Sequence, residues 1–456
     1  MTVAKSNGSL RCVSRALVVL GLLGAHGVLC AQSMSFLQVL DLAKQNDPKY
    51  QMVRQDLEVR REQVAQAFAQ MLPSVSYSYN RTDIQRTMLN TAASGSSPIL
   101  SENKTLTLRQ PLFRKALFGN HEKTKLMLEA AEQDFIREEL DLSVRTLTNY
   151  LEILTVQELL ETNSAQLVTL RAQLDYAEKA SVRGFTRKTD VLDAQSRLSS
   201  LESDRLSLQG RLSLAKTALF KLIRFENHPL WKPSYTRIMA LKKTDRSLQD
   251  WWATAQERSP VIKSLQAIEQ AAKKDVEVSG AGHLPTLDLL IQKVNSTSEV
   301  PSSPGFSYKD QQVGFQMSLP IYSGGAVTAT ERQSVAAYTK AGLQLEYQSD
   351  QLQLEIQTSY NGMQEALSRL QSLQVDLQSK SENVRAVELA YKAGLDSKLS
   401  LLQAQERLLQ TRYGQADYAG RYLQAWLKIN ASSGQLDEPF LVEFNTAFDV
   451  QPELKN

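Results

Sequence analysis

Two hydrophobic periods divide this chain into different kinds of segment. In residues 74–80, Ser-Val-Ser-Tyr-Ser-Tyr-Asn, every second side chain is apolar, which predicts a β-strand with one apolar and one polar face. The same alternation occurs at three further places. We therefore predict four strands, at about 74–84, 103–110, 285–295 and 310–319.

A long segment with helical spacing follows each pair of predicted strands. Apolar residues recur there in alternating steps of four and three, the seam of a coiled coil. They are Leu140, Val144, Leu147, Leu151 and Leu154 in the first segment, and Ile356, Tyr360, Met363, Leu367 and Leu370 in the second. We predict long helices over about 115–181, 189–223, 325–393 and 399–430. The first would be roughly 100 Å long.

The whole pattern occurs twice along the chain. Leu72-Pro73 recurs as Leu284-Pro285, and Asp47-Pro48 as Ser259-Pro260, both 212 residues later (72 to 284 and 47 to 259). The segment Gln-Pro-Leu-Phe at 110–113, before the first long helix, recurs as Leu-Pro-Ile-Tyr at 319–322, an offset of 209. Gly184, after that helix, recurs as Gly394, an offset of 210. This self-similarity predicts a tandem duplication.

The duplication sets the expected domain organisation. We expect a first repeat over 32–246, a second over 247–430, and a C-terminal segment over 431–456. Asp47 and Pro48 begin a helix that ends near Pro73, and this helix is expected to stack end to end with 189–223 against the long helix. The segment at about 224–246 is then expected at mid-height on the outside.

The N-terminus, residues 1–31, is typical of a secretory signal peptide. Basic residues precede an apolar run from Ala16 to Leu29, too short for a membrane-spanning helix, and Ala31 suits a cleavage site. Both cysteines, Cys12 and Cys30, lie in this segment. We therefore expect the mature chain to have neither a disulfide nor a cysteine metal site.

Charge and histidine content argue against nucleic-acid binding and catalysis. The chain has 52 basic and 49 acidic residues, and three of the basic ones lie in the signal peptide, so the rest is balanced. His121, His228 and His283 stand at no metal-ligand spacing, and no nucleophile motif is present. We expect no catalytic residue, metal or cofactor.

Four short strands need a covering surface, because a small open sheet leaves its edges unpaired. Their apolar faces could pack on helices, as in a soluble α+β domain, or the sheet could close with those of other chains. The predicted helices are far longer than the strands and cannot wrap them, and an export signal suits an outer-membrane β-barrel. Three chains would supply twelve strands, enough for an aqueous channel.

Three segments then carry a family resemblance: 313–325 (Val-Gly-Phe-Gln-Met-Ser-Leu-Pro-Ile-Tyr-Ser-Gly-Gly), 110–113, and the doubled Gly with Ala-Gln-x-Arg-Leu. Through them, and over essentially its whole mature length, the chain resembles the TolC-like outer-membrane channels of efflux and type I secretion systems. The resemblance implies a homotrimer with a twelve-stranded barrel continuous with a periplasmic helical tunnel. It also implies contact with outer-membrane lipid, a periplasmic adaptor, and an inner-membrane ABC transporter or proton-driven pump as partners.

The same resemblance implies that the hairpin tips, 182–189 and 392–399, close the tunnel. Acidic residues would form its constriction. At the matching positions this sequence has Asp190 and Asp193 in the first repeat, but Ser400 and Gln403 in the second. We expect the two aspartates to supply the acidic groups; the alternative, for Asp190 and for Asp193, is that the carboxylate only caps or charges the N-terminus of a helix. The other candidates for the gate are Asp396, which replaces a basic residue, Tyr391, Arg183, Arg187, Lys188, Lys392 and Lys398.

Glycine and proline mark two further places. Gly184 and Gly394 are expected to permit the tight hairpin turns. The expected junction between barrel and tunnel contains Pro111, Pro320, Gly324 and Gly325. Phe113, Tyr77, Tyr79, Phe315 and Tyr322 are candidates for the aromatic girdles at the membrane interfaces; the alternative is that some of them only fill the lipid-facing surface.

The predicted function is an outer-membrane exit duct. We favour type I protein secretion, because the second repeat departs from the acidic ring of the general-purpose channels. The outer-membrane component of a small-molecule efflux pump is the alternative. A periplasmic adaptor and a structural coiled coil are more remote, because neither needs two strand–hairpin units.

Overall fold

The structure, a computed structural model, describes residues 34–87, 96–224, 230–234, 237–238, 246–300 and 303–449. The predicted signal peptide and most of the segment at 224–246 lie outside the described residues.

The helices and strands of the two repeats follow one another in the same order. The first repeat contains α1 (Phe36–Asn46), α2 (Pro48–Ala69), β1 (Ser74–Thr87), β2 (Ser96–Phe113), α3 (Lys115–Val182) and α4 (Lys188–Ile223). The second contains α6 (Leu248–Arg258), α7 (Pro260–Gly280), η1 (Ala281–His283), β4 (Thr286–Val300), β5 (Ser303–Ser318), α8 (Ala326–Lys392) and α9 (Lys398–Ser432). Three short elements, β3 (Lys232–Pro233), α10 (Glu438–Asn445) and β6 (Phe448–Asp449), lie outside this repeat pattern.

The first helix of each repeat was not anticipated, although its start is marked in the sequence. Ser35 caps α1 in a capping box with Gln38, and Ser247 caps α6 in a capping box with Asp250. Ser35 and Ser247 are separated by the same 212 residues as the other markers. The duplicated unit therefore begins one helix earlier than Pro48.

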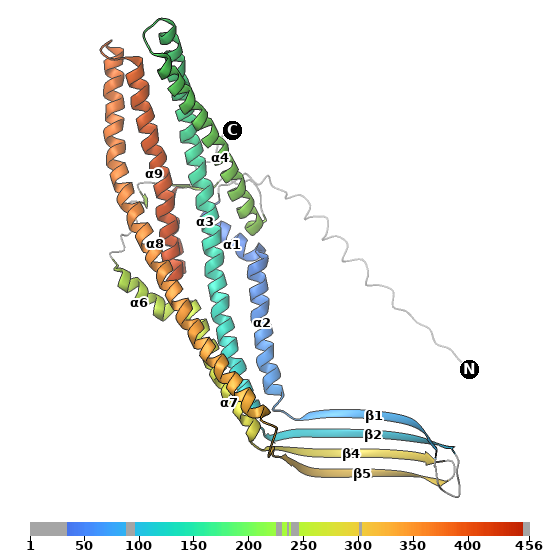
Figure 1. The fold of residues 1–456 in the computed structure, drawn as a ribbon. Coiled ribbons are helices and arrows are strands. Elements are labelled where there is room, and N and C mark those ends of the chain that lie inside the picture. Colours follow the sequence, from blue (N-terminus) through green and yellow to red (C-terminus); the bar gives the residue numbers. More distant parts are fainter. Residues whose placement is uncertain are drawn as a thin grey trace, which may run out of the picture.

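Two long helical hairpins stand on a sheet that extends to one side at their base (Figure 1). α3 packs against α4 and α9, and α8 packs against α9. α2 and α4 lie one beyond the other along α3, and α7 lies between the lower parts of α3 and α8. Of the described residues, none forms a helix with the length and apolarity that a membrane crossing requires.

The four strands form one antiparallel sheet in the order β1-β2-β4-β5. Its register places Val75, Leu108, Ile291 and Val313 side by side on one face. The adjoining row, Ser76, Thr107, Gln292 and Gln312, lies on the opposite face. The predicted alternation of an apolar and a polar face is thus continuous across all four strands.

The strands extend further from the helices than predicted. β1 reaches Thr87 instead of 84, and β2 begins at Ser96 instead of 103. The residues added to β2 pair in register with β1, but their two apolar members, Ile99 and Leu100, are consecutive and follow Pro98, so they do not alternate. Hydrophobic alternation could not indicate these ends.

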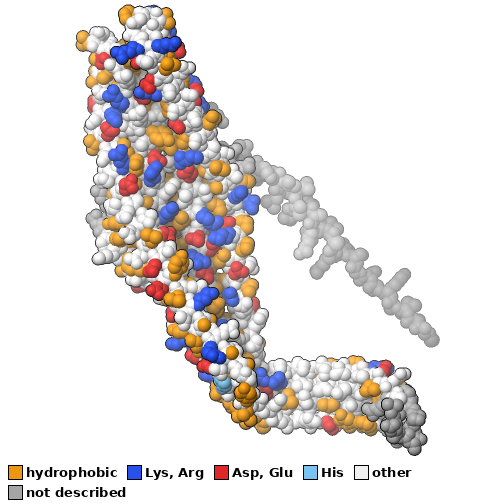
Figure 2. Space-filling model, viewed as in Figure 1, with side chains coloured by type: hydrophobic (Ala, Val, Ile, Leu, Met, Phe, Trp, Pro, Cys, Tyr) orange, Lys and Arg blue, Asp and Glu red, His pale blue; other side chains and the backbone are white. Residues whose placement is uncertain are grey.

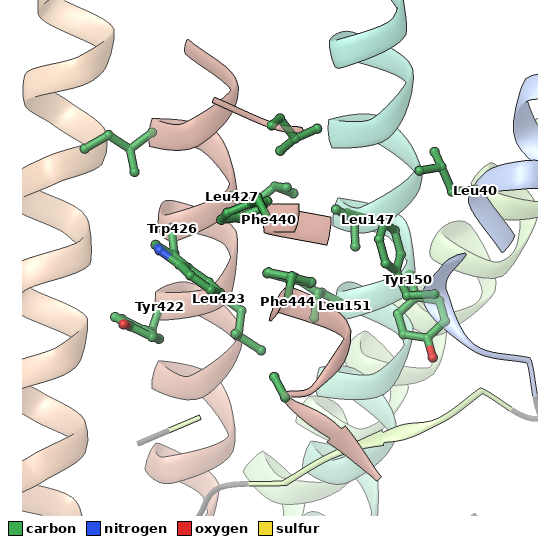
Figure 3. Packing of buried hydrophobic residues seen from close by; sticks show 14 of the residues in the cluster. Leu40, Leu147, Tyr150, Leu151, Tyr422, Leu423, Trp426, Leu427, Phe440 and Phe444 are labelled. Atoms are coloured by element: carbon green, nitrogen blue, oxygen red, sulfur yellow. The ribbon is translucent and has the colours of Figure 1, made fainter. Parts of the chain in front are cut away.

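The main core lies at mid-height, where α1 and α10 pack on the long helices (Figure 3). Phe36 of α1 and Phe444 of α10 have ring centroids 5.9 Å apart, and Phe444 also stacks on Trp426 of α9. β3 and β6 pair beside this cluster. The first and last described segments of the chain, which contain α1 and β6, thereby meet around the middle of both hairpins. The predicted fold class, long helical hairpins continuous with four strands per chain, is confirmed.

Candidate functional site: the hairpin tips and the sheet-to-helix junction

The two hairpin tips have the same backbone geometry. Gly184 and Gly394 have φ angles of +75° and +72°, in the left-handed region that favours glycine. The next residue in each turn, Phe185 or Leu395, donates its N–H to a carbonyl five residues earlier, at 2.9 and 2.8 Å. The chain reverses direction twice by the same turn, at the end of the molecule farthest from the sheet (Figure 1).

The helices that leave the two turns are capped differently. In the first repeat, the Asp190 carboxylate accepts the Arg187 N–H at 3.2 Å. In the second repeat, Ser397 Oγ accepts the Ser400 N–H at 3.1 Å, and Asp396 accepts the Ser397 N–H at 2.7 Å. Asp190, Asp396 and Ser397 therefore all help to start a helix at the tip, and Ser400 supplies the backbone N–H that Ser397 caps.

Asp193 belongs to a polar contact that joins the two hairpins. Its carboxylate lies 3.0 Å from Arg197 on the next turn of α4. Arg197 also lies 3.9 Å from Glu406 of α9, and Gln173 of α3 donates to Glu406 at 3.2 Å. Asp193 and Arg197 are more than half exposed, so this contact is hydrated. Gln403, one turn before Glu406, is exposed.

Tyr391 and Lys392 make local contacts at the second tip. The Lys398 ammonium lies 5.3 Å from the centroid of the Tyr391 ring, a cation–π distance. Lys392 binds Glu388 at 2.7 Å, and this hydrogen bond and charge lower the pKa of the Glu388 carboxyl.

Basic and apolar side chains remain exposed at the tips. Arg183, Arg187 and Lys188 have no ion pair within 4 Å among the described residues. Phe185 and Leu395 occupy equivalent positions in the two turns and are 83% and 84% exposed. Figure 2 shows Lys and Arg side chains near the tips on the face in view. The arrangement offers two matching apolar side chains in a basic setting.

The junction between sheet and helices bends at the predicted glycines. Gly324 and Gly325 have φ angles of +61° and +81°, and Gly325 directly precedes α8. Pro320 lies between the end of β5 and this bend. Pro111 stands in β2 where the register with β4 shifts. The two repeats thus use different devices, a glycine pair and a bulge, to pass from strand to helix.

The junction also contains a cluster of charged side chains that the sequence pattern did not predict. Asp288 of β4 accepts hydrogen bonds from Arg109 of β2 at 2.9 and 2.5 Å, and from Arg114 at 2.8 and 2.6 Å. Its side chain is 3% exposed, whereas those of the two arginines are 45% and 30% exposed. Two guanidiniums around one carboxylate leave a net positive charge on the polar face of the sheet. A pairing of residues more than 170 positions apart needs the strand register, which no local signal supplies.

Within the described part of the chain, no group of three or more His, Cys, Asp and Glu side chains is placed to hold a metal ion.

Comparison with protein families adds an independent line of evidence. The family model described as "Outer membrane efflux protein" matches residues 39–223 and 251–435. The two matches start 212 residues apart, at the offset seen between the sequence markers. Together they cover most of the chain.

Curated relatives match over almost the full length. The chain is 28% identical to "Proteases secretion protein PrtF" of Dickeya chrysanthemi, over 95% of each chain. It is 26% identical to "Alkaline protease secretion protein AprF" of Pseudomonas aeruginosa, covering 91% of this chain and 88% of the relative. It is 23% identical to "Outer membrane protein TolC" of Escherichia coli, covering 91% and 85%.

Solved structures share the fold. The outer membrane protein VceC of Vibrio cholerae superposes with a TM-score of 0.70 at 19% identity, over 88% of this chain and 96% of that one. The CmeC outer membrane channel of Campylobacter jejuni superposes with a TM-score of 0.72 at 16% identity, over 91% and 90%. With the duplicated family match, these likenesses agree with the predicted resemblance and its outer-membrane location. The chain belongs to the outer membrane efflux protein family, the channels to which TolC belongs.

Proposed function

We propose that the chain is the outer-membrane exit duct of a type I protein-secretion system and acts as a homotrimer. The observation that carries the choice of protein cargo is the near full-length likeness to two protease secretion proteins. The partners in this proposal are a periplasmic adaptor and an inner-membrane ABC transporter. Export of small molecules, with a proton-driven pump in place of the ABC transporter, is the alternative, supported by the match to the outer membrane efflux protein family and by the similarity to an efflux protein of Brucella suis.

The edges of the single chain support assembly with other copies. β1 and β5 are the outer strands of the sheet, so each has one side without a strand partner among the described residues. The helices above them also have exposed large apolar side chains. These are Met52, Val59 and Phe68 on α2, Leu192, Leu206 and Leu214 on α4, and Leu343, Tyr347, Leu354 and Val375 on α8.

These unpartnered faces lie on different elements, so copies can join head to tail. β5 and α8 of one copy would pack on β1, α2 and α4 of the next. Three copies close the ring with twelve strands, and the polar sheet face lines the lumen. The apolar face then contacts outer-membrane lipid.

The tips are proposed as the end that closes and docks. Phe185 and Leu395 would insert into the adaptor, because each is an exposed apolar anchor at an equivalent turn. Asp190 and Asp193, both exposed, would add six carboxylates near the axis of a trimer and favour cations. Asp396, Tyr391, Arg183, Arg187, Lys188, Lys392, Lys398, Ser400 and Gln403 complete the proposed gate.

Conductance tests the gate. An Asp190→Asn, Asp193→Asn trimer in planar bilayers should show a reduced preference for cations. The matched control is Asp350→Asn, an exposed aspartate on α8 away from the tips. Unchanged selectivity in the double variant would remove both aspartates from the constriction.

Complementation tests the cargo. The chain is expressed in a strain that has a protease-exporting ABC transporter and its adaptor but lacks its own outer-membrane protein. We expect protease in the medium and little change in sensitivity to small toxic compounds. Restored drug resistance without secreted protease would favour the efflux alternative. The Phe185→Ser, Leu395→Ser variant should form trimers but lose secretion.

A further inference from the structure

The register of the sheet arranges its apolar face in rows that change character along the strands. Nearest the helices, Leu287 lies opposite Met317, and Leu289 lies opposite Phe315. The next row is Val75, Leu108, Ile291 and Val313. All these residues face the side that we assign to lipid.

Lysines enter the next two rows on the same face. The first is Tyr77, Leu106, Lys293 and Gln311, and the second is Tyr79, Lys104, Asn295 and Lys309. Lys104, Lys293 and Lys309 are all exposed. We call these three residues the basic band.

The basic band has more positive charge than its carboxylate neighbours balance. Lys293 and Lys309 have no carboxylate within 4 Å among the described residues. Lys104 lies 3.7 Å from Glu102, but Arg81 of the following row lies at the same distance from that carboxylate. Tyr79 also donates to Glu102 at 3.2 Å. One carboxylate is therefore shared by two cations, and two lysines have none.

The position of the basic band matches the edge of a hydrocarbon layer. From Leu287 to Asn295 is about 27 Å along the strand. At a strand tilt of about 40°, this corresponds to about 20 Å along the membrane normal, against an apolar band of about 25 Å in outer-membrane barrels. Exposed Ile321 and Tyr322 extend the apolar surface toward the helices. The basic band then lies at the interface on the side away from the helices.

Lysine at such a boundary keeps its stem in apolar surroundings and extends its ammonium into the headgroup layer. Tyr77 and Tyr79 lie in the same two rows, and Lys104 stands 5.5 Å from the centroid of the Tyr79 ring. Amphipathic rings beside cations are typical of a membrane interface. A negatively charged headgroup in that layer would neutralise the positive charge of the basic band that Glu102 leaves unbalanced.

We propose that the basic band binds the phosphate groups of outer-leaflet lipid, with Lys293 and Lys309 as the principal ligands and Lys104 as the third. This inference rests on the proposed function, because it needs the sheet closed into a barrel with the helices in the periplasm. Three copies would bring nine lysines to the lipid boundary. Phosphate is the fitting chemistry because each ammonium offers three donors to a multiply charged acceptor.

The test uses the purified full-length protein in detergent, with bisphosphorylated lipid A and its dephosphorylated form as probes. Retained lipid is measured by native mass spectrometry as the salt concentration is raised. The wild-type trimer should retain the phosphorylated form preferentially and lose it with salt. Lys104→Gln, Lys293→Gln, Lys309→Gln should weaken retention by about fivefold per lysine, on the order of a hundredfold in all.

The matched control removes the same charge elsewhere: Lys125→Gln, Lys263→Gln and Lys273→Gln, at exposed positions on α3 and α7. It should retain phosphorylated lipid as the wild type does. Equal retention of the two lipid forms by the wild type would overturn the inference without any variant. Loss of retention in the control alone, or an unaffected basic-band variant, would do the same.

The mass and conductance of the same wild-type preparation separate this inference from the proposed function. Conducting trimers that do not distinguish the two lipids would leave the channel intact and remove the lipid site. Absence of trimers and of conductance would contradict the proposed function itself.

Discussion

Arg114, the residue just before α3, donates two hydrogen bonds to Asp288 near the start of β4, although 174 residues separate them in the chain. Arg109, near the end of β2, binds the same carboxylate. The cluster therefore ties the centre of the sheet, where the first repeat meets the second, to the base of the longest helix. Asp288 is buried in it, so its charge depends on both arginines.

Asp288→Asn should destabilise this junction. The substitution leaves two guanidiniums close together without the carboxylate that holds them. We expect a loss of about 1–3 kcal/mol, below the value for a fully buried ion pair because both arginines are partly exposed. The heat resistance of the purified protein in detergent measures it. Asp310→Asn, an exposed aspartate on the same face of the sheet, is the control and should melt as the wild type does.

Gly394→Ala should loosen the second hairpin tip. The φ angle of +72° costs a residue with Cβ about 1–2 kcal/mol, although space around the position is open. Hydrogen exchange of residues 390–398 should become faster.

Gly414→Ala, in α9 of the same hairpin, is the matched control for the tip variant. A Cβ there would lie 3.5 Å from Leu373, an ordinary contact, so helix propensity should make alanine neutral or stabilising. Equal effects of the two substitutions would show that the turn geometry does not control the tip.

The repeated architecture could be predicted because its signals are local and occur twice. Alternating side chains such as Val75, Tyr77 and Tyr79 fix which face of a strand is apolar, and the seam from Leu147 to Leu154 is buried as its spacing predicts. Gly184 and Gly394 mark their turns because left-handed backbone favours glycine.

Features that depend on register or on distant segments could not be predicted. Asp288 and Arg114 look like ordinary polar residues until β4 is paired with β2. The same holds for Arg197 and Glu406, which meet only because α4 and α9 both pack on α3. At the tips, the sequence suggested both a cap and an acidic constriction for Asp190; the cap contact is present, and the constriction remains a proposal that needs the assembled trimer.

Tyr150→Phe should weaken the core at mid-height. The Tyr150 hydroxyl accepts the Trp231 N–H at 3.0 Å and lies 3.2 Å from the Met34 carbonyl, so it joins α3 to two segments near the ends of the first repeat. Burial raises the pKa of this phenol, and the Trp231 hydrogen bond acts in the opposite direction. We expect a loss of about 1–2 kcal/mol in unfolding free energy.

Chemical denaturation of the purified protein measures the loss at Tyr150. Tyr176→Phe, at an exposed tyrosine of the same helix, is the control and should change stability by less than about 0.5 kcal/mol. A Tyr150→Phe protein as stable as the control would mean that the hydroxyl contributes nothing to the core.

Acid should loosen the second hairpin through Asp376. Hydrogen bonds from Lys380 and Thr411 lower the pKa of this carboxyl, and Thr411 belongs to the facing helix α9. Because the pKa of Asp376 is lower in the folded protein, its stabilisation is complete above the ordinary aspartate pKa of about 4. The stabilisation is lost as the pH falls through the lower pKa of the folded state. Hydrogen-exchange protection around residues 376 and 411 should therefore fall in strong acid.

The variants Asp376→Asn and Asp350→Asn show whether this carboxylate causes the acid response. Asp376→Asn cannot titrate, so its local protection should be lower at neutral pH and change little on acidification. Asp350→Asn removes an exposed carboxylate elsewhere on α8 and should keep the wild-type response. If Asp376→Asn lost protection in acid as steeply as the wild type, the acid sensitivity of the hairpin would have to come from other carboxylates.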